Sequence, residues 1–444
     1  MVRILKSIRL VLLASLVGFL LIVAAFLIPK TWIEGNTERS FNLIYDETGY
    51  HDANTWYANS RYDNYTDAVM LGIALNVKDT QPVEAAARDT LLWNDWLTEN
   101  PINPTSYYFF LQRQRHINGD EYTDKEISQI GTYDYSRYFH GYLIVLRPLL
   151  IFFHLGDIRY IHMFVQILLV AYLIKLLYDA NRKGLILPFL ATYFFMHPFA
   201  VSQDLQNISI FYTMLISSIL LLKFRDRIAK KPENLSIIFV GIGCATSYFD
   251  FLTYPVAAFG IPAIIALSLF VPDSGNRFIS TFKMGIGWSF GYVGMWMMKW
   301  LYSALILGFK NFDIAFSAGR RFGLEDLNYA TGNTMNFFDV ILVQLYAAST
   351  IVLLILFITF IIHSIQKIRQ GQKITPTASL LVLLYILIPN LWYVVVVNHS
   401  RLHYWMEYRE LAVAVFALFA IFELSRTETK SQDTKQPQKI DPTV

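Results

Sequence analysis

The sequence predicts an all-α polytopic membrane protein with about ten transmembrane helices. The chain has 444 residues, of which 55% are hydrophobic and 16% charged, and its mean hydropathy is +0.38. Soluble domains combine fewer apolar residues with more charged ones. Uncharged runs such as 10–28 and 348–362 approach or reach the roughly 20 residues that cross a hydrocarbon core. The single cysteine, Cys244, lies inside an apolar run, which excludes an internal disulfide framework and a cysteine metal site.

Ten apolar segments account for the predicted spans. They cover residues 9–29, 159–178, 184–200, 206–223, 235–251, 255–271, 282–302, 338–362, 377–397 and 409–424. An eleventh apolar stretch, 139–155, contains Arg147-Pro148, and we expect it to be interfacial or re-entrant. If it crossed the membrane, the basic clusters at 175–183 and 223–231 would lie outside, against the bias of basic loops toward the cytoplasm. If residues 139–155 do not cross the membrane, both termini and the basic loops are cytoplasmic.

This assignment divides the chain into six regions. They are an anchor helix (1–29), a large extracytoplasmic loop with amphipathic interfacial helices (30–158), a transmembrane core (159–302), a second extracytoplasmic loop (303–337), C-terminal transmembrane helices (338–424) and a disordered cytoplasmic tail (425–444). The first segment has basic residues before an apolar run that is too long for a signal peptide, so it is expected to remain as an anchor. We therefore expect a multi-pass protein of the plasma membrane.

Polar residues concentrate near the external ends of the predicted spans, whereas a pump or channel is expected to place ionisable groups at mid-membrane. The first candidate site is 61–76. Asp63 and Asp67 are four residues apart, with Tyr65 between them, at the amino end of a predicted helix. Carboxylates placed there can act as a general base or share a divalent cation. The alternative is that either aspartate only caps the helix.

Two further candidates consist of basic residues. Arg137, His140 and Arg147 lie in the tyrosine-rich amphipathic stretch 132–150, where an arginine inside an apolar run favours an anion such as a lipid phosphate. The alternative for this stretch is an anchor that contacts ordinary headgroups. Arg320-Arg321 could bind phosphate by bidentate bonds. A solvated loop, or pairing with nearby acids, is the alternative there.

Asp204 and Asp250 lie at or near external span ends, where they could orient a substrate hydroxyl. Asp250 has almost no other polar group near it in the sequence, and pairing with an arginine from another loop is the alternative.

The stretch 398–410, NHSRLHYWMEYRE, is the most polar segment between two apolar runs. His399, His403 and Glu407 recur at i, i+4 and i+8, which predicts one face of a helix and is compatible with zinc binding. However, no glutamate follows the first histidine as in HExxH, and Arg401 and Arg409 disfavour a cation. We therefore expect Arg409 and one histidine to face a phosphate, with Glu407 or Glu410 holding the arginine in place.

The order of these features resembles the GT-C superfamily of polytopic glycosyltransferases. The resemblance covers roughly residues 30–300 and rests on the order of spans and polar turns in 155–184, 187–227 and 235–267. It implies a bacterial-type enzyme that uses polyprenyl-phosphate-linked sugars at the outer membrane face. It also implies an essential carboxylate in the first external loop, which points to Asp63 or Asp67, with Asp46-Glu47 in reserve. External arginines and histidines would hold the lipid phosphate, in positions that match Arg147, Arg320, Arg321, His403 and Arg409.

The expected function is an inverting transfer of a sugar from a polyprenyl-phosphate-linked donor to an extracytoplasmic glycan or lipid-linked acceptor. The expected partners are that donor, that acceptor and membrane lipids, with no nucleic acid. Whether a divalent cation is a cofactor stays open. Loop aromatics would stack on sugars or form an interfacial belt: Trp56, Tyr57, Tyr62, Tyr65, Trp93 and Trp96. The alternatives are a transporter or flippase of lipid-linked glycans and a non-catalytic scaffold.

Overall fold

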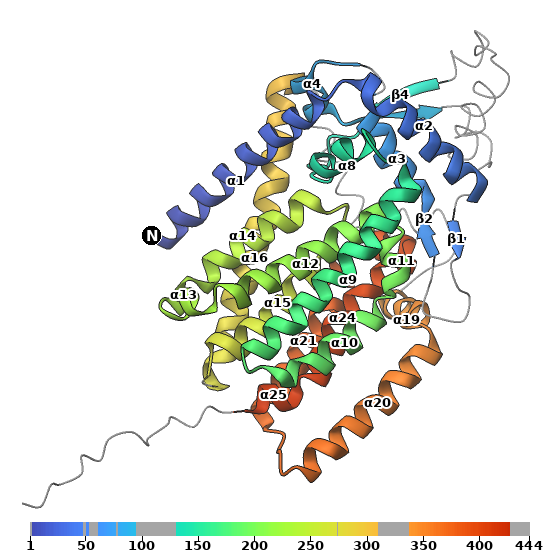
Figure 1. Cartoon of the computed structure of the whole chain (residues 1–444). Coiled ribbons are helices and arrows are strands. Elements are labelled where there is room, and N and C mark those ends of the chain that lie inside the picture. Colours follow the sequence, from blue (N-terminus) through green and yellow to red (C-terminus); the bar gives the residue numbers. More distant parts are fainter. Residues whose placement is uncertain are drawn as a thin grey trace, which may run out of the picture.

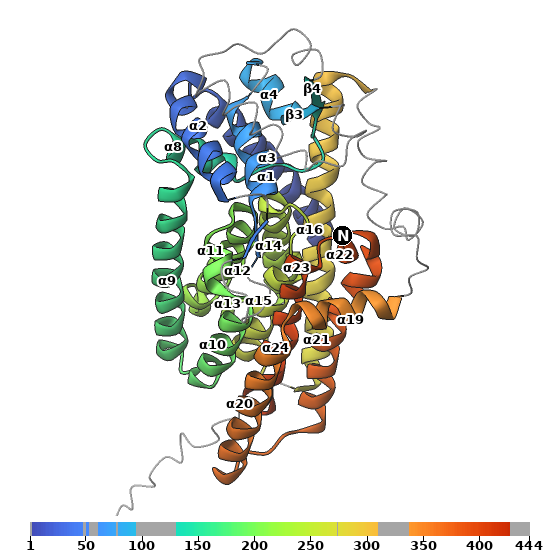
Figure 2. The same cartoon turned by 90° about the vertical axis from the view of Figure 1, so that its right-hand side faces the viewer.

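The structure, a computed structural model, describes residues 2–47, 50–52, 61–76, 79–94, 130–272, 274–309 and 337–426. Most of these residues form a bundle of long helices, and smaller elements cover one end of it (Figures 1 and 2). The longer bundle helices are α1 (Val2–Phe26), α9 (Leu155–Asp179), α10 (Ile186–Phe195), α12 (Leu205–Lys223), α14 (Leu235–Phe249), α15 (Pro255–Phe270), α16 (Ser274–Leu307), α20 (Thr350–Arg369), α21 (Pro376–Val395) and α24 (Ala412–Phe419).

The covering layer, which we call the cap, comes from the first half of the chain. Its elements are α2 (Lys30–Glu47), β1 (Tyr50–Asp52), β2 (Arg61–Asp63), α3 (Asn64–Leu75), α4 (Pro82–Arg88), β3 (Thr90–Asn94), β4 (Ile130–Asp134) and α8 (Leu143–Leu150). The strands form two short antiparallel pairs, β1 with β2 and β3 with β4, and the other described elements are helices, so the expected all-α fold class is confirmed.

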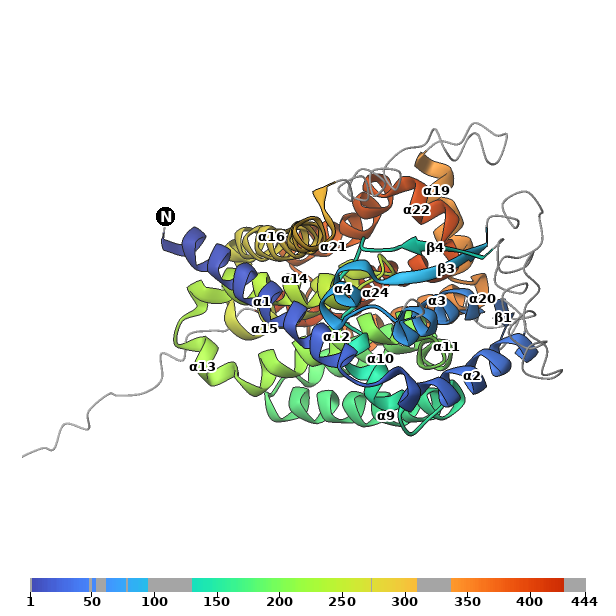
Figure 3. The same cartoon turned by 90° about the horizontal axis from the view of Figure 1, so that it is seen from above.

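The remaining helical elements, of 3 to 11 residues, connect the bundle helices. They are η1 (Lys183–Leu185), α11 (Pro198–Ser202), α13 (Arg225–Ala229), η2 (Pro232–Asn234), α19 (Phe337–Ala347), α22 (Val397–Leu402), α23 (Tyr404–Glu407), η5 (Tyr408–Leu411) and α25 (Ile421–Ser425). Seen from above, α9 and α16 lie at opposite edges of the bundle, with α12 between them (Figure 3).

Within the described residues, five helices are long and apolar enough to cross a membrane. They are Arg3–Phe26, Leu155–Asp179, Leu205–Lys223, Thr350–Arg369 and Pro376–Val395. Their length and composition indicate a membrane-embedded protein. The other predicted spans correspond to helices that are shorter or more polar, such as the ten-residue α10 and the 34-residue α16.

Several predicted spans are interrupted. Residues 338–362 do not form one helix, because α19 ends at Ala347 and α20 begins at Thr350; between them Ser349 has a φ of +65°. The segment 184–200 is broken after α10 at His197, which has a φ of +57°. The last span, 409–424, is divided among η5, α24 and α25. A helix cannot continue through a left-handed residue, so each positive φ redirects the chain.

The stretch that contains Arg147 forms α8, which has only eight residues. At about 1.5 Å per residue this is roughly 12 Å, too short to cross a bilayer. The Arg147 side chain is buried and donates through Nε to the carbonyl of Ala25 at 2.9 Å, through Nη2 to that of Ile28 at 2.5 Å, and through Nη1 to that of Ala74. Arg147 thus joins α8 to the carboxyl ends of α1 and α3 instead of facing a lipid phosphate.

Two contacts fix the cap and the bundle core. The Lys299 ammonium of α16 is fully buried, pairs with Asp89 between α4 and β3, and donates to the carbonyl of Ala86 at 2.7 Å. In the bundle, α14 and α16 approach so closely that Gly243 and Gly291 leave no room for a Cβ atom. The buried Asp89–Lys299 pair therefore joins the cap to α16, and the glycines allow α14 and α16 to pack closely.

Candidate functional site

Three buried carboxylates meet where the cap contacts the amino end of α12. Asp63 caps α3, Asp67 lies in the first turn of α3, and Asp204 caps α12. Their exposed fractions are 2%, 0% and 1%. The Asp63 amide donates to Asp204 Oδ2 at 3.1 Å, and the Leu205 amide donates to Asp67 Oδ1 at 2.9 Å. Each helix terminus is thus bound by a carboxylate from the other segment, which fixes the three side chains in one cluster.

Polar side chains surround this carboxylate cluster. Arg159, in the first turns of α9, donates through Nη2 to Asn64 Oδ1 at 2.6 Å and lies 3.4 Å from Asp67 Oδ2. Gln206 donates through Nε2 to Asp63 Oδ2 at 3.2 Å. The sequence interpretation did not single out Arg159, Asn64 or Gln206. An arginine near the start of an otherwise apolar span was the available signal for Arg159.

The electrostatics of the carboxylate cluster favour proton binding. Burial, and then the neighbouring Asp204 charge, raise the pKa of Asp63 to about 6. The same two causes raise the pKa of Asp67 well above its usual range, against the opposing charge of Arg159. Burial also raises the pKa of Asp204, although amide donors and the charge of Arg409 oppose this rise. Carboxylates with such raised pKa values can take up a proton near neutral pH.

Asp63 and Asp67 differ in how their oxygens are used. Asp63 accepts from the Thr66 amide at 2.9 Å, the Thr66 hydroxyl at 2.8 Å and the Gln206 amide group, so it is a saturated helix cap. Among the described residues, Asp67 Oδ2 has only the 3.4 Å contact with Arg159, which is longer than the roughly 2.7–2.9 Å of a good charge-assisted hydrogen bond. Asp67 therefore retains more capacity to accept a proton from a substrate.

Arg409 lies fully buried at the start of η5. It donates through Nε to the carbonyl of Met196 at 2.8 Å and through Nη1 to those of Trp405 at 3.2 Å and Met406 at 3.4 Å. In the part of the chain that the structure describes, Nη2 has no hydrogen-bond partner. Arg409 thus combines a fixed position near Asp204 with one donor available for an anion.

The glutamates near Arg409 do not hold it, contrary to the sequence-based expectation. Glu410 accepts from the amides of Val256 at 3.0 Å and Ala257 at 2.9 Å, so it caps α15. Glu407 accepts from the Ser400 hydroxyl at 2.6 Å and lies 3.3 Å from His399 Nε2. Backbone carbonyls, and not carboxylates, position the arginine.

The predicted continuous helix through His399, His403 and Glu407 is interrupted at His403, where α22 ends and α23 begins. His399 Nε2 lies 2.6 Å from the carbonyl of Leu252, and its ring centroid is 4.3 Å from that of His403. His399 and Glu407 are therefore buried side by side, with the half-buried His403 against His399, and His399 contacts the turn before α15. Among the described residues, no three His, Cys, Asp or Glu side chains are arranged to hold a metal ion.

Asp250, the polar residue between α14 and α15, accepts from the Thr253 amide at 2.8 Å and from the Tyr292 hydroxyl at 2.5 Å. No arginine pairs with it in the described part of the chain, so the alternative of an arginine partner is not seen there. It is buried and serves the turn before α15.

The candidates of the tyrosine-rich stretch lie away from the carboxylate cluster. The His140 ring is buried, with Nε2 3.1 Å from the Tyr135 carbonyl, and burial followed by the Lys299 charge lowers its pKa to about 3. A neutral buried imidazole is a poor phosphate ligand. The Arg137 guanidinium lies over the Tyr135 ring, with 5.4 Å between Cζ and the ring centroid. Tyr65 is half-buried in α3, and its pKa is raised by burial and by the nearby Asp63 charge.

Some predicted site residues lie outside the described residues. They are Arg320 and Arg321, the aromatic residues Trp56, Tyr57 and Trp96, and the side chains of Asp46, Glu47, Tyr62 and Trp93.

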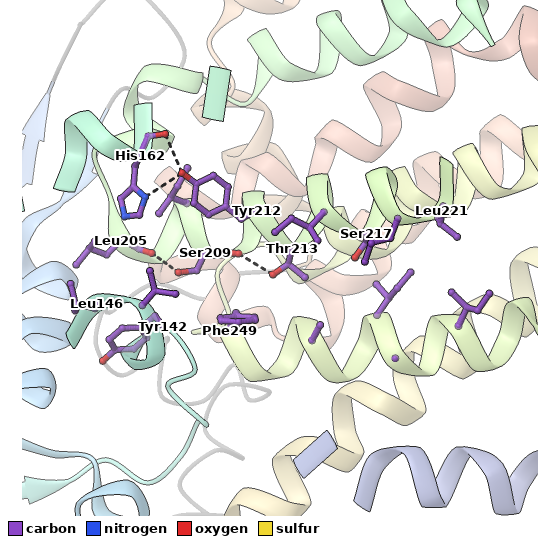
Figure 4. Close-up of a pocket in the computed structure, with 18 of the residues that line it drawn as sticks. Tyr142, Leu146, His162, Leu205, Ser209, Tyr212, Thr213, Ser217, Leu221 and Phe249 are labelled. Atoms are coloured by element: carbon purple, nitrogen blue, oxygen red, sulfur yellow. Dashed lines mark hydrogen bonds between the residues drawn. The ribbon is translucent and has the colours of Figure 1, made fainter. Parts of the chain in front are cut away.

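An apolar groove of about 550 Å³ runs along α12 and begins beside the carboxylate cluster. One end is formed by Tyr142, His162 of α9 and Leu205, and the other by Leu221 and neighbouring residues (Figure 4). Met70 of α3 also lines the groove. The opposite wall is α14. From Leu205 to Leu221 the groove follows about 24 Å of helix at about 1.5 Å per residue.

The groove connects directly to the carboxylate cluster. Met70 is one helical turn from Asp67, His162 is one turn from Arg159, and Leu205 follows Asp204 in the chain. The His162 ring is fixed by Tyr212, whose hydroxyl lies 3.2 Å from Nδ1 (Figure 4). None of the described lining residues is Asp, Glu, Lys or Arg. The carboxylate cluster therefore adjoins one end of the apolar groove.

Comparisons of this chain with protein-family models, with curated proteins and with solved structures found no match.

Proposed function

We propose that this protein is a membrane glycosyltransferase that moves a sugar from a polyprenyl-phosphate-linked donor to an extracytoplasmic glycan or lipid-linked acceptor. The observation that carries this proposal is the carboxylate cluster at the head of an apolar groove that is longer than one leaflet of the bilayer core. An enzyme for a lipid-linked sugar needs both parts, one for the chemistry and one for the chain. The resemblance to the GT-C superfamily points in the same direction.

In the proposed reaction Asp67 is the general base. The acceptor hydroxyl oxygen attacks the anomeric carbon, its proton passes to Asp67 Oδ2, and the bond from that carbon to the phosphate oxygen breaks with inversion. The electron pair leaves with the lipid phosphate. Asp63 and Asp204 support the base by raising its pKa, which strengthens its affinity for the proton at neutral pH.

Two arginines are proposed to bind the leaving phosphate. Arg409 has an available Nη2 donor, and Arg159 lies 3.4 Å from Asp67 and one helical turn before His162, which lines the groove. Positive charge fixed in a buried site stabilises the negative charge that develops on the phosphate. Both arginines are held by protein contacts before a substrate binds, so they need little reorganisation. His403, Arg320 and Arg321 remain proposed additional ligands.

The dimensions of the groove favour an isoprenoid chain. The hydrocarbon core of a bilayer is about 30 Å thick, and an ordinary acyl chain reaches only half of that distance. A groove that follows about 24 Å of α12 extends beyond one leaflet. A polyprenyl chain is long enough to fill it from the carboxylate cluster to the far end.

The proposal places the carboxylate cluster at the outer face of the plasma membrane, with ten spans and both termini inside. Support comes from the basic residues at the opposite end of the bundle, in the turns near Arg182, Lys223 and Lys367. A transporter or flippase of lipid-linked glycans is the alternative. It needs polar partners for a sugar phosphate along the path, and the described lining of the groove offers no charged residue.

Vesicles that contain the purified protein and radiolabelled polyprenyl-phosphate sugars test the proposal. We expect label to move from lipid to acceptor with the wild-type protein. Asp67→Asn should reduce this rate by about 10²–10⁴-fold, the usual contribution of a general base. Asp79→Asn, at an exposed position of the same cap, is the matched control and should keep the rate. Wild-type transfer by Asp67→Asn, or movement of intact donor across the bilayer without transfer, would contradict the proposal.

A further inference from the structure

A second cavity, of about 280 Å³, lies at the end of the bundle opposite the carboxylate cluster. Three distant parts of the chain meet around it: the turn between α9 and η1, the carboxyl end of α20 with the turn that follows, and α25 (Figure 1). The lining residues that matter for its chemistry are Lys183, His363, Lys367, Gln372, Glu423 and Arg426. We call this the basal cavity.

The basal cavity carries excess positive charge. Three of its lining residues are cations, and Glu423 is the one carboxylate among its described lining residues. Glu423 is already engaged, because Arg426 Nη1 lies 3.1 Å from Oε2 and Arg182 Nη1 lies 3.6 Å from Oε1. Neither Lys183 nor Lys367 forms an ion pair in the described part of the chain. Two ammonium groups are thus available at the cavity.

The ammonium groups are held near the cavity by their surroundings. Lys183 Nζ lies over the Tyr178 ring, 3.9 Å from its centroid. Lys367 is one turn after His363, whose buried ring contacts Phe419 and Phe422 at centroid distances of 6.3 and 5.8 Å. Of these rings, His363 and Phe422 line the cavity and form an apolar side, while the lysines form its charged side.

From this arrangement we propose that the basal cavity binds the phosphate of an anionic phospholipid. Ammonium groups with polar neighbours such as Gln372 suit a phosphate with several acceptor oxygens. The volume is at the lower limit for sites that enclose a whole small molecule, about 300–1,000 Å³, so it fits a headgroup phosphate better than a nucleotide. Basic pockets between membrane helices are a known form of headgroup site.

The outside of α20 supplies a surface for the acyl chains. Ile361, Ile365 and Ile368 are 40%, 45% and 58% exposed, and only 11% of the apolar window of α20 is buried within the protein. Lys367, which lines the cavity, lies in the last turn of this helix. A lipid with its phosphate between Lys183 and Lys367 would therefore tie α20, the least buried of the candidate spans, to the ends of α9 and α25.

Thermal unfolding of the purified full-length protein in detergent tests this inference, with phosphatidylglycerol, phosphatidylcholine or inorganic phosphate added. Phosphatidylglycerol should raise the unfolding temperature of the wild type, and the zwitterionic lipid should not. Lys183→Gln/Lys367→Gln should weaken the phosphatidylglycerol effect about 30-fold in lipid concentration, since each basic residue near an anionic headgroup contributes about a factor of five. Lys230→Gln/Lys231→Gln, which neutralises two exposed basic residues at the same end of the bundle but outside the cavity, is the matched control and should respond like the wild type.

Three results would overturn the inference. The first is that Lys183→Gln/Lys367→Gln keeps the full effect of phosphatidylglycerol. The second is that both double variants lose this effect equally, which would indicate a general charge effect. Inorganic phosphate alone could also produce the whole shift, which would assign the cavity to a soluble phosphate. If the double variant unfolds before lipid is added, the single variants Lys183→Gln and Lys367→Gln carry the same test, each with about a fivefold effect. Sugar transfer is not involved in these measurements, so they are independent of the proposed function.

Discussion

Replacing Lys299 by Met tests whether the buried Asp89–Lys299 pair holds the cap on the bundle. Both side chains are fully buried, and Lys299 also donates to the Ala86 carbonyl at 2.7 Å. Methionine leaves a buried carboxylate without its cation. Breaking a buried pair in this way destabilises proteins by about 3–5 kcal/mol. We expect a loss of this size in the free energy of unfolding.

The loss should depend on pH. Burial raises the pKa of Asp89 to about 7 even though the Lys299 charge opposes the rise, and without Lys299 the pKa rises further. The folded variant therefore keeps a proton that the unfolded chain, with an aspartate pKa near 3.9, releases. Between these two values the unfolded state binds fewer protons, so the stability of the variant falls as pH rises. Lys299→Met should thus be less stable at pH 8 than at pH 6.

Unfolding of the full-length protein in mixed detergent, followed by tryptophan fluorescence, measures these differences. Asp89→Asn/Lys299→Met should recover most of the stability, because neutral groups replace both charges. Lys175→Met is the matched control: it breaks an exposed pair with Asp179, where the side chains are 66% and 40% exposed, and should cost less than about 1 kcal/mol. The reasoning is refuted if Lys299→Met is as stable as the wild type at both pH values, or if the double variant is no more stable than the single one.

Three further predictions concern the site, the groove and α8. Asp63→Asn keeps a good helix cap but removes a charge that raises the pKa of Asp67, so the acid limb of the pH–rate profile for sugar transfer should move to lower pH; an unchanged limb would contradict the coupling. Ala245→Phe, in the wall of the groove, should slow transfer from a long-chain donor about 100-fold through misplacement of the sugar, and should spare a ten-carbon donor; equal losses would disprove the role of the groove. Arg147→Lys can replace only part of the contacts to three carbonyls and should lower the free energy of unfolding by about 3 kcal/mol in the fluorescence assay, whereas wild-type stability would show that these bonds contribute little.

Hydropathy predicted where most helices lie but not where they break. Each predicted span contains helical residues, because apolar runs of this length have few alternatives in a membrane. The breaks at His197 and Ser349 depend on a left-handed backbone conformation that non-glycine residues seldom adopt. Nothing in the local apolar pattern signals such a residue. The short strands of the cap were missed for a related reason, since three to five residues give too little periodicity to detect.

The candidate site was predictable residue by residue, but not as an arrangement. Asp63, Asp67 and Asp204 stood out as acids near apolar segments. Their meeting depends on mutual capping between α3 and α12, which are more than a hundred residues apart in the chain. Arg159 lies among apolar neighbours, so its role became visible only beside Asp67.

Arg147 and Arg409 illustrate why a buried charge alone does not identify a ligand. Burying an arginine without a hydrogen-bond acceptor costs free energy, and both arginines have acceptors. The acceptors are the carbonyl groups left unpaired at helix ends, which any helix provides. Arg147 directs all three of its nitrogens to such carbonyls, whereas Arg409 directs two and leaves Nη2 without a partner among the described residues. That single difference in donor use, which no sequence pattern encodes, supports the proposal that Arg409 binds the phosphate, whereas the contacts of Arg147 are structural.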